Sequence, residues 1–279
     1  MIFSHRFRMM AQEGHLASNA LLTGLEGLAK SDHYQPGTIY TSLFNLSIGL
    51  ERLMKIIFVT YHMATNDLNT PSNNTLRNKF RHSLVNIYDH LRIVGEDNGI
   101  KDGWYEEASL HYDALNFLSI FADKSRYHNL DLLSKGIGGS DPLITWYGLH
   151  LRIADESLSY QRRAAINEQA IAYCDRSNMH GFAMGMRGEY ELIVDIVYQL
   201  ELTKRTRGHC VWTILQIIKP LYRLLCWACS QAHQVEIAKG LQEPVVPHLD
   251  EIFPYGLITR GDAIRRKAWT TLFFMGGHY

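Results

Sequence analysis

Apolar residues recur at spacings of three and four over most of this chain, which is the period of one buried face of an α-helix. The clearest runs cover 8–30 and 38–65, where apolar side chains make a broad face. Turn-forming residues then interrupt the period. We expect a third helix over about 75–94, with a polar cap before it, and a fourth helix over 104–124.

The helical period returns in the second half over 143–175 and 187–206. The stretch 211–232 is strongly apolar, but it also carries charged residues, so we expect a buried helix kinked at Pro220 and no membrane span. The basic stretch 204–209 is interpreted as an exposed helix end whose charges complement the helix dipole. Alternating strand patterns are scarce, and the pattern as a whole predicts an all-α protein.

Glycine, proline and small polar residues mark the connections between these helices. The stretch 136–142 contains three glycines and a proline, and it is the predicted hinge between two helical units, 1–135 and 143–279. A Met- and Gly-rich segment at 177–186 is predicted to be a flexible connector and a candidate contact for a partner.

Net charge and cysteine positions bear on two functional classes, nucleic-acid binding and metal binding. The 28 Lys and Arg residues equal the 28 Asp and Glu residues, so no overall basic field attracts nucleic acid, and such binding requires a local patch. The four cysteines lie within apolar helical patterns, which is typical of reduced, buried thiols. Cys226 and Cys229 have metal-ligand spacing but lack a second pair, and we expect no metal site and a cytoplasmic protein.

The main candidate for chemistry lies on the predicted third helix. Arg77 is followed by the polar Asn78 and, after four intervening residues, by His82. A permanently charged guanidinium near an imidazole that exchanges protons near neutral pH suits catalysis on a phosphodiester. Lys79 and Arg81 add a local basic patch for RNA phosphates. The spacing alone arises easily by chance, and a solvated helix start with a structural histidine is the alternative.

Three segments of the first half, in order, resemble the HEPN superfamily, a group of helical domains found in prokaryotic toxin and phage-defence systems. Residues 48–55 resemble the second helix of the family, with its acidic residue and later lysine. Residues 81–84 are similar to its His-Asp-Leu step, and residues 126–128 to the Arg-Tyr-Pro step of one branch. The resemblance covers about 20–135 and implies an up-and-down helical bundle followed by a helical extension.

The resemblance also implies a function. Many members are metal-independent endoribonucleases whose motif matches Arg77, Asn78 and His82 residue by residue. On that basis His82 assists attack of a ribose 2′-hydroxyl, Arg77 stabilises the phosphoryl oxygens, and Asn78 orients them. We therefore expect a toxin or antiviral-defence ribonuclease that acts on RNA as a homodimer, needs no cofactor, and is restrained by an antitoxin or regulatory protein.

Two departures keep a second interpretation open. Ser83 replaces the Asp of one step and His128 replaces the Pro of the other, so the alternative is a non-catalytic module that binds a nucleotide or a protein partner, or a plain helical scaffold. Glu51 and Lys55 either form an intrahelical ion pair, the default at this spacing, or place an acid beside the motif. A possible secondary polar site consists of Glu51, Arg126, His128, Asn129 and Asp131.

Overall fold

A computed structural model describes residues 3–72, 74, 82–125, 127–136 and 139–273. Helices account for 74% of it and strands for 2%, which confirms the all-α class. The helices are α1 (His5–Lys30), α2 (Pro36–Thr65), α3 (Leu84–Asp97), α4 (Leu110–Ile120), α5 (His128–Lys135), α6 (Pro142–Ser157), α7 (Tyr160–Arg176), α8 (Ile193–Ala238) and α9 (Arg260–Arg265). Two strands, β1 (Phe182–Met184) and β2 (Tyr190–Leu192), complete the regular elements together with short 3₁₀ and π turns.

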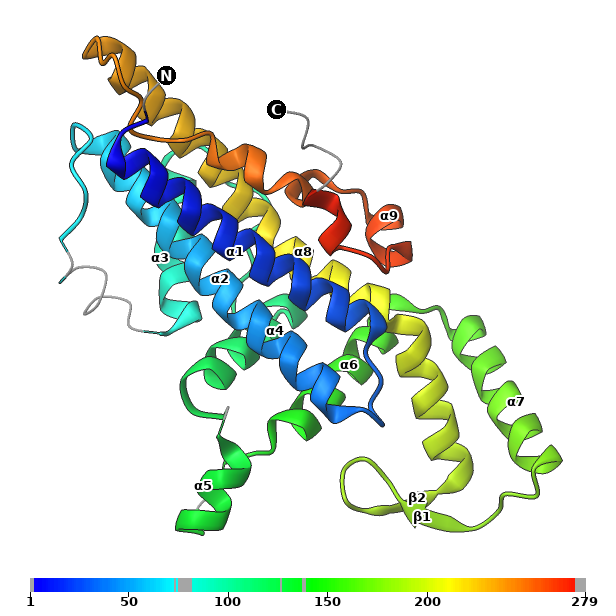
Figure 1. The fold of residues 1–279 in the computed structure, drawn as a ribbon. Helices are drawn as coiled ribbons and strands as arrows, with labels where there is room; N and C mark the ends of the chain where they lie inside the picture. Colours follow the sequence, from blue (N-terminus) through cyan, green and yellow to red (C-terminus); the bar gives the residue numbers. More distant parts are fainter. Residues whose placement is uncertain (1–2, 73, 75–81, 126, 137–138, 274–279) are drawn as a thin grey trace.

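Helices α1 and α2 form a tightly packed antiparallel pair, drawn in dark and light blue in Figure 1. Glycines bring the two backbones together. A methyl group on Gly24 would lie 2.6 Å from the Cγ of Leu46, and one on Gly49 would lie 2.7 Å from the Cγ of Leu21. In each contact, a glycine of one helix faces a leucine of the other. Close approach at both points therefore depends on residues without a side chain.

The core is shared by both halves of the chain. Helix α8 is 46 residues long and packs against α1, α2, α4 and α6, so it runs along the whole bundle (Figure 1). One buried cluster contains Leu50 from α2, Trp146 from α6 and Leu215 from α8. Apolar packing thus joins elements on either side of 136–142. The division into functional units 1–135 and 143–279 stays a prediction.

The predicted helix end at 204–209 is wrong, because this basic stretch lies inside α8. Thr206 and Gly208 are buried there. A methyl group on Gly208 would overlap the carbonyl oxygen of Ile264, at the place where α9 packs on α8. Arg207 reaches back to Asp32, with 3.5 Å between the guanidinium and carboxylate atoms. Tertiary packing therefore carries the helix through residues that look like a solvated terminus.

The third helix begins later than its periodicity predicts. Ser83 is the N-cap of α3, and its hydroxyl accepts a hydrogen bond from the Asn86 amide at 3.3 Å. Serine is a preferred cap, so the helix starts at Leu84 and His82 lies in the turn before it. The prediction of a helix running through His82 is therefore wrong at that residue, and 75–81 lie outside the described residues. Ser109 caps α4 in the same way, at a later position than predicted.

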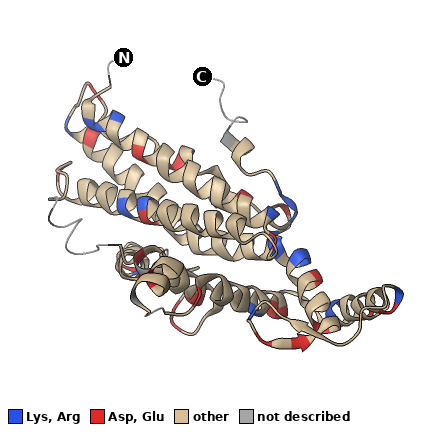
Figure 2. Cartoon of the chain, turned by 60° about the horizontal axis from the view of Figure 1, so that its bottom comes forward, with Lys and Arg blue, Asp and Glu red and all other residues tan. Residues whose placement is uncertain are grey.

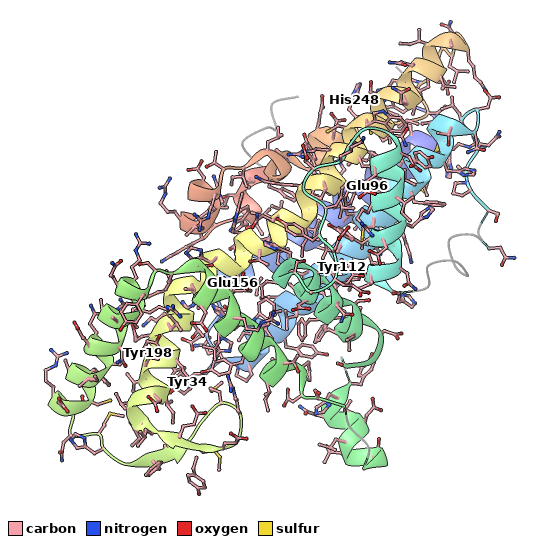
Figure 3. The ribbon with its side chains drawn as sticks, turned by 180° about the vertical axis from the view of Figure 1, so that it is seen from behind. Tyr34, Glu96, Tyr112, Glu156, Tyr198 and His248 are labelled. Atoms are coloured by element: carbon pink, nitrogen blue, oxygen red, sulfur yellow. The ribbon has the colours of Figure 1, made fainter. Side chains whose placement is uncertain are left out.

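The segment predicted as a flexible connector contains β1, which pairs antiparallel with β2 to form a short hairpin. We refer to residues 160–202, which comprise α7, the hairpin and the first turns of α8, as the arm. The arm projects from the bundle in Figure 1. A small separate cluster, with Ile166 and Leu202 buried and Tyr198 packed against them, holds α7 to α8; Tyr198 is labelled in Figure 3.

Charges are mixed over the molecule. Figure 2 shows lysines and arginines interspersed with aspartates and glutamates along the helices, as expected for a chain with zero net charge. Among the described residues, no helix has the length and apolar character that crossing a membrane requires.

Candidate functional site

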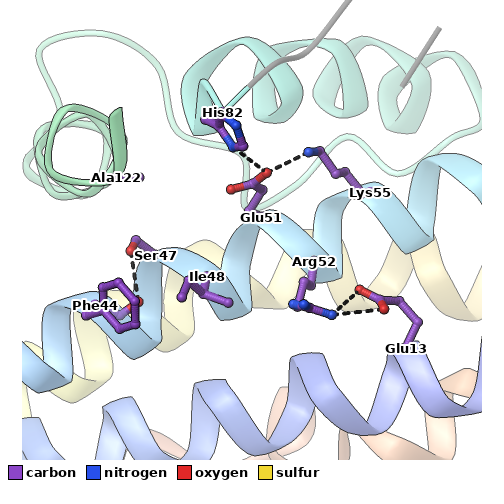
Figure 4. A pocket seen from close by; sticks show the side chains of 9 residues that line it. All are labelled: Glu13, Phe44, Ser47, Ile48, Glu51, Arg52, Lys55, His82 and Ala122. Carbon is purple, nitrogen blue, oxygen red and sulfur yellow. Dashed lines mark hydrogen bonds and ion pairs between the residues drawn. The ribbon is translucent and has the colours of Figure 1, made fainter. Parts of the chain in front are cut away.

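A pocket of about 420 Å³ opens between α1, α2 and the turn that precedes α3 (Figure 4). Helix α2 supplies most of its wall, since residues three and four apart on one helix face the same side. The π-helical turn Phe121–Ser125 after α4 supplies Ala122. The lining side chains are Glu13, Phe44, Ser47, Ile48, Glu51, Arg52, Lys55, His82 and Ala122.

His82 is held at this pocket by Glu51. The Nδ1 atom of His82 lies 3.0 Å from Oε1 of Glu51, and the same oxygen lies 2.6 Å from Nζ of Lys55. Glu51 is mostly buried, with 17% of its side chain exposed, whereas the His82 side chain is 61% exposed. A fixed carboxylate therefore orients an accessible imidazole through Nδ1, which leaves Nε2 as the nitrogen for proton exchange with a bound molecule.

Both alternatives considered for Glu51 occur together. It forms the intrahelical ion pair with Lys55 and also lies beside the motif histidine. A second pair shares the pocket, because Nη1 of Arg52 lies 2.7 and 2.9 Å from the two carboxylate oxygens of Glu13. Two acids are thus matched by two bases at the pocket.

The other residues that the sequence suggested are described only in part. Arg77, Asn78 and Arg126 lie outside the described residues. His128 and Asn129 line a different pocket of about 260 Å³ at the start of α5, and this pocket does not include Glu51. Asp131 lies on α5 and is not among the residues that line either pocket. Among the described residues of the possible secondary site, Glu51 thus lines the pocket of His82, whereas His128 and Asn129 line the other pocket.

A buried pair of histidines was not suggested by the sequence. Nε2 of His33 lies 3.0 Å from Nδ1 of His150, and Nε2 of His150 lies 3.1 Å from Oγ1 of Thr206. Burial lowers the pKa of His33 to about 4 and the pKa of His150 well below its ordinary value. The pair links the α1–α2 loop to α6 and α8. Because 117 positions separate the two histidines, no local pattern could reveal it.

The cysteines are free thiols. Cys174, Cys210 and Cys229 are buried and Cys226 is half-buried, in agreement with the interpretation from their apolar surroundings. Burial raises the pKa of Cys229 to about 12 and also raises that of Cys226, which disfavours the thiolate that a metal or a redox reaction requires. Within the described part of the chain, no three His, Cys, Asp or Glu side chains are grouped so as to hold a metal ion.

Comparison with known proteins leaves the site without an assigned family. No family model, curated protein or solved structure matches this chain. The interpretation of the pocket therefore rests on its own geometry and on the short motifs in the sequence.

Proposed function

We propose that this protein is a metal-independent endoribonuclease of the toxin or antiviral-defence kind, acting on RNA as a homodimer. The observation that supports it best is the exposed imidazole of His82, oriented by Glu51 at the edge of a pocket. A positioned histidine beside a carboxylate is the usual arrangement for general acid–base catalysis.

In the proposed reaction, Nε2 of His82 removes the proton from a ribose 2′-hydroxyl. The 2′-oxygen bonds to the adjacent phosphorus while the bond from phosphorus to the 5′-oxygen breaks. That oxygen takes up a proton from water, and His82 returns its proton to water. The products are a 2′,3′-cyclic phosphate and a 5′-hydroxyl. Glu51 favours the imidazolium formed in the first step, since an opposite charge at hydrogen-bond distance stabilises it. Arg77 is assigned to stabilise the negative charge that develops on the phosphoryl oxygens, and Asn78 is assigned to orient those oxygens.

Substitution of the histidine tests this function. We expect wild-type protein to cut a mixed-sequence RNA and His82→Ala to lose about 10²-fold or more of that activity, the range typical of a general acid–base group. His5→Ala is the matched control, because His5 is an exposed histidine at the start of α1 and does not line the His82 pocket. Circular dichroism establishes that all three proteins are equally folded.

The alternative function, binding of a nucleotide or a protein partner without chemistry, is the other outcome of the same experiment. A folded wild type that leaves RNA intact, or a His82→Ala variant as active as wild type, contradicts the ribonuclease proposal. Titration of ATP and GTP against wild type and Lys55→Met would then measure whether the pocket binds nucleotides.

A further inference from the structure

The hairpin of the arm presents an apolar face to solvent. Phe182 and Leu192 lie opposite each other, as do Met184 and Tyr190. The four residues are 69%, 43%, 57% and 75% exposed in that order. The other face, with Ala183 and Glu191, is less exposed. A contiguous exposed apolar group on a projecting element is the usual mark of a surface that another molecule covers.

The outer edge of β1 also has backbone groups directed away from the hairpin. The Gly185 amide donates to the Glu189 carbonyl at 2.8 Å, and the Ile193 amide donates to the Gly181 carbonyl at 3.0 Å. In an antiparallel ladder, hydrogen-bonded pairs alternate with non-bonded pairs, so the amides and carbonyls of Phe182 and Met184 point outward. Within the described residues the sheet has two strands, and this edge has no third strand beside it.

We propose that β1 pairs antiparallel with β1 of a second copy of this chain. One register pairs both outward residues of each β1 strand. Phe182 bonds opposite the partner's Met184, Met184 bonds opposite the partner's Phe182, and Ala183 faces its own equivalent on a twofold axis. The strand is thus complementary to itself, as the isologous interface of a symmetric dimer requires. The two hairpins become one four-stranded sheet, and their apolar faces join on one side.

Charge complementarity favours a second copy as the occupant. In this register the hairpin turn, which carries the exposed Arg187, extends along the partner segment that precedes β1. That segment borders a pocket of about 240 Å³ lined in part by Asp175 and Met179. The guanidinium of one copy therefore approaches a carboxylate and an apolar hollow of the other. Symmetry repeats the contact, so each dimer contains it twice.

The interface is small. Strands of three residues bury less area than the interfaces of tight complexes, so we expect association in the micromolar range and a dimer only at comparable protein concentrations. None of the arm residues lines the His82 pocket. The proposal rests on the homodimer of the proposed function, but because the arm does not line the His82 pocket, failure to dimerise and failure to cut RNA are measured separately.

Cross-linking tests the register. Ala183 and its equivalent form a non-bonded pair in this arrangement, with Cα atoms about 4.5 Å apart, which is within the range of a disulfide. Under mild oxidation we expect Ala183→Cys to give a disulfide-linked dimer. Glu191→Cys is the matched control, because it lies on the same face of the other strand and, like the wild type with its native cysteines, would form no disulfide between the two copies. Equal or absent cross-linking of both variants overturns the proposal.

Sedimentation equilibrium tests the association itself. Met184→Lys adds a charge to the proposed edge and should raise the dissociation constant of the dimer at least about tenfold. Leu257→Lys changes an exposed apolar residue outside the arm and should leave the dissociation constant unchanged. A wild type that is monomeric at about 100 µM, or a dimer whose dissociation constant is unchanged by Met184→Lys, overturns the proposal. The occupant of the β1 edge would then be a strand from another protein.

Discussion

The Glu51 carboxylate lies 3.0 Å from Nδ1 of His82, although the two residues are 31 positions apart and on different elements. One is fixed on the long helix α2, and the other precedes the Ser83 cap of α3. The contact therefore depends on how α3 packs against α2. It is the relationship on which the proposed chemistry rests.

Glu51→Gln should lower RNA cleavage by about tenfold or more, because an amide still contacts the ring but does not stabilise its cationic form. The initial rate on a defined single-stranded RNA measures this effect. Glu13→Gln is a matched control, since Glu13 lines the same pocket but pairs with Arg52. Equal losses in the two variants would mean that Glu51 acts only through the fold.

Acid should destabilise the protein through the buried histidine pair. Burial holds the pKa of His33 near 4, below its ordinary value of 6.5, and holds that of His150 well below the same ordinary value. Between these values the unfolded chain binds protons that the folded chain does not, so stability falls as the pH drops from 6.5 towards 4. Each histidine that stays neutral contributes a slope of about 1.4 kcal/mol per pH unit.

Urea unfolding at a series of pH values measures this slope. In His33→Gln, one of the two groups responsible is removed, and the slope between pH 6.5 and 4 should decrease. His180→Gln removes an exposed histidine instead and should leave it as in wild type. A wild-type slope unaffected by His33→Gln would show that other groups cause the acid sensitivity.

The α1–α2 contact should not tolerate a methyl group. Gly49→Ala places Cβ 2.7 Å from the Cγ of Leu21 and 2.9 Å from the Leu21 backbone nitrogen, so a helix must shift. We expect a loss of about 1–3 kcal/mol in the free energy of unfolding, typical of overpacking. Gly37→Ala, in open space on the same helix, should instead change stability by less than about 1 kcal/mol, in the stabilising direction. Thermal unfolding distinguishes the two results.

Glu26 should stabilise the chain near its C-terminal end. Its Oε2 atom accepts hydrogen bonds from the amides of Trp269 and Thr270 at 2.8 and 2.9 Å. The hydrogen bonds from Lys30 and Thr270 lower the Glu26 pKa to about 2 from 4.5. Glu26→Ala should lower the unfolding free energy by about 1–3 kcal/mol above pH 4.5.

The sign of the pH dependence tests the same contact. A carboxylate whose pKa is lowered by folding stabilises the protein above its ordinary pKa and loses that effect as the pH falls towards 2. The difference between wild type and Glu26→Ala should therefore shrink below pH 4.5. A difference that stays constant down to pH 3 would indicate loss of packing and not of charge.

Long periodic elements were predictable from sequence, and short or distant ones were not. The apolar faces of α1 and α2 extend over many turns, and their predicted ends lie within three residues of the observed ones. The start of α3 was misplaced because the local cap at Ser83 determines it. The hairpin escaped prediction because strands of three residues are too short to show alternation.

The candidate site divides in the same way. The local spacing of Arg77 and His82 suggested the histidine, but the sequence does not show whether its side chain is exposed. The sequence suggested Glu51 either as a partner of Lys55 or as an acid beside the motif. Glu51 makes both contacts, which no sequence pattern shows. The His33–His150 pair depends wholly on the packing of three distant elements, so only the fold reveals it.

The most direct test of the proposed function is analysis of the RNA ends produced in EDTA. A general acid–base mechanism with internal attack predicts 2′,3′-cyclic phosphate and 5′-hydroxyl ends from wild type, and none of these products from His82→Ala. Cleavage that requires a divalent metal, or that leaves 5′-phosphate ends, would contradict the assignment of His82 as the proton-transfer residue.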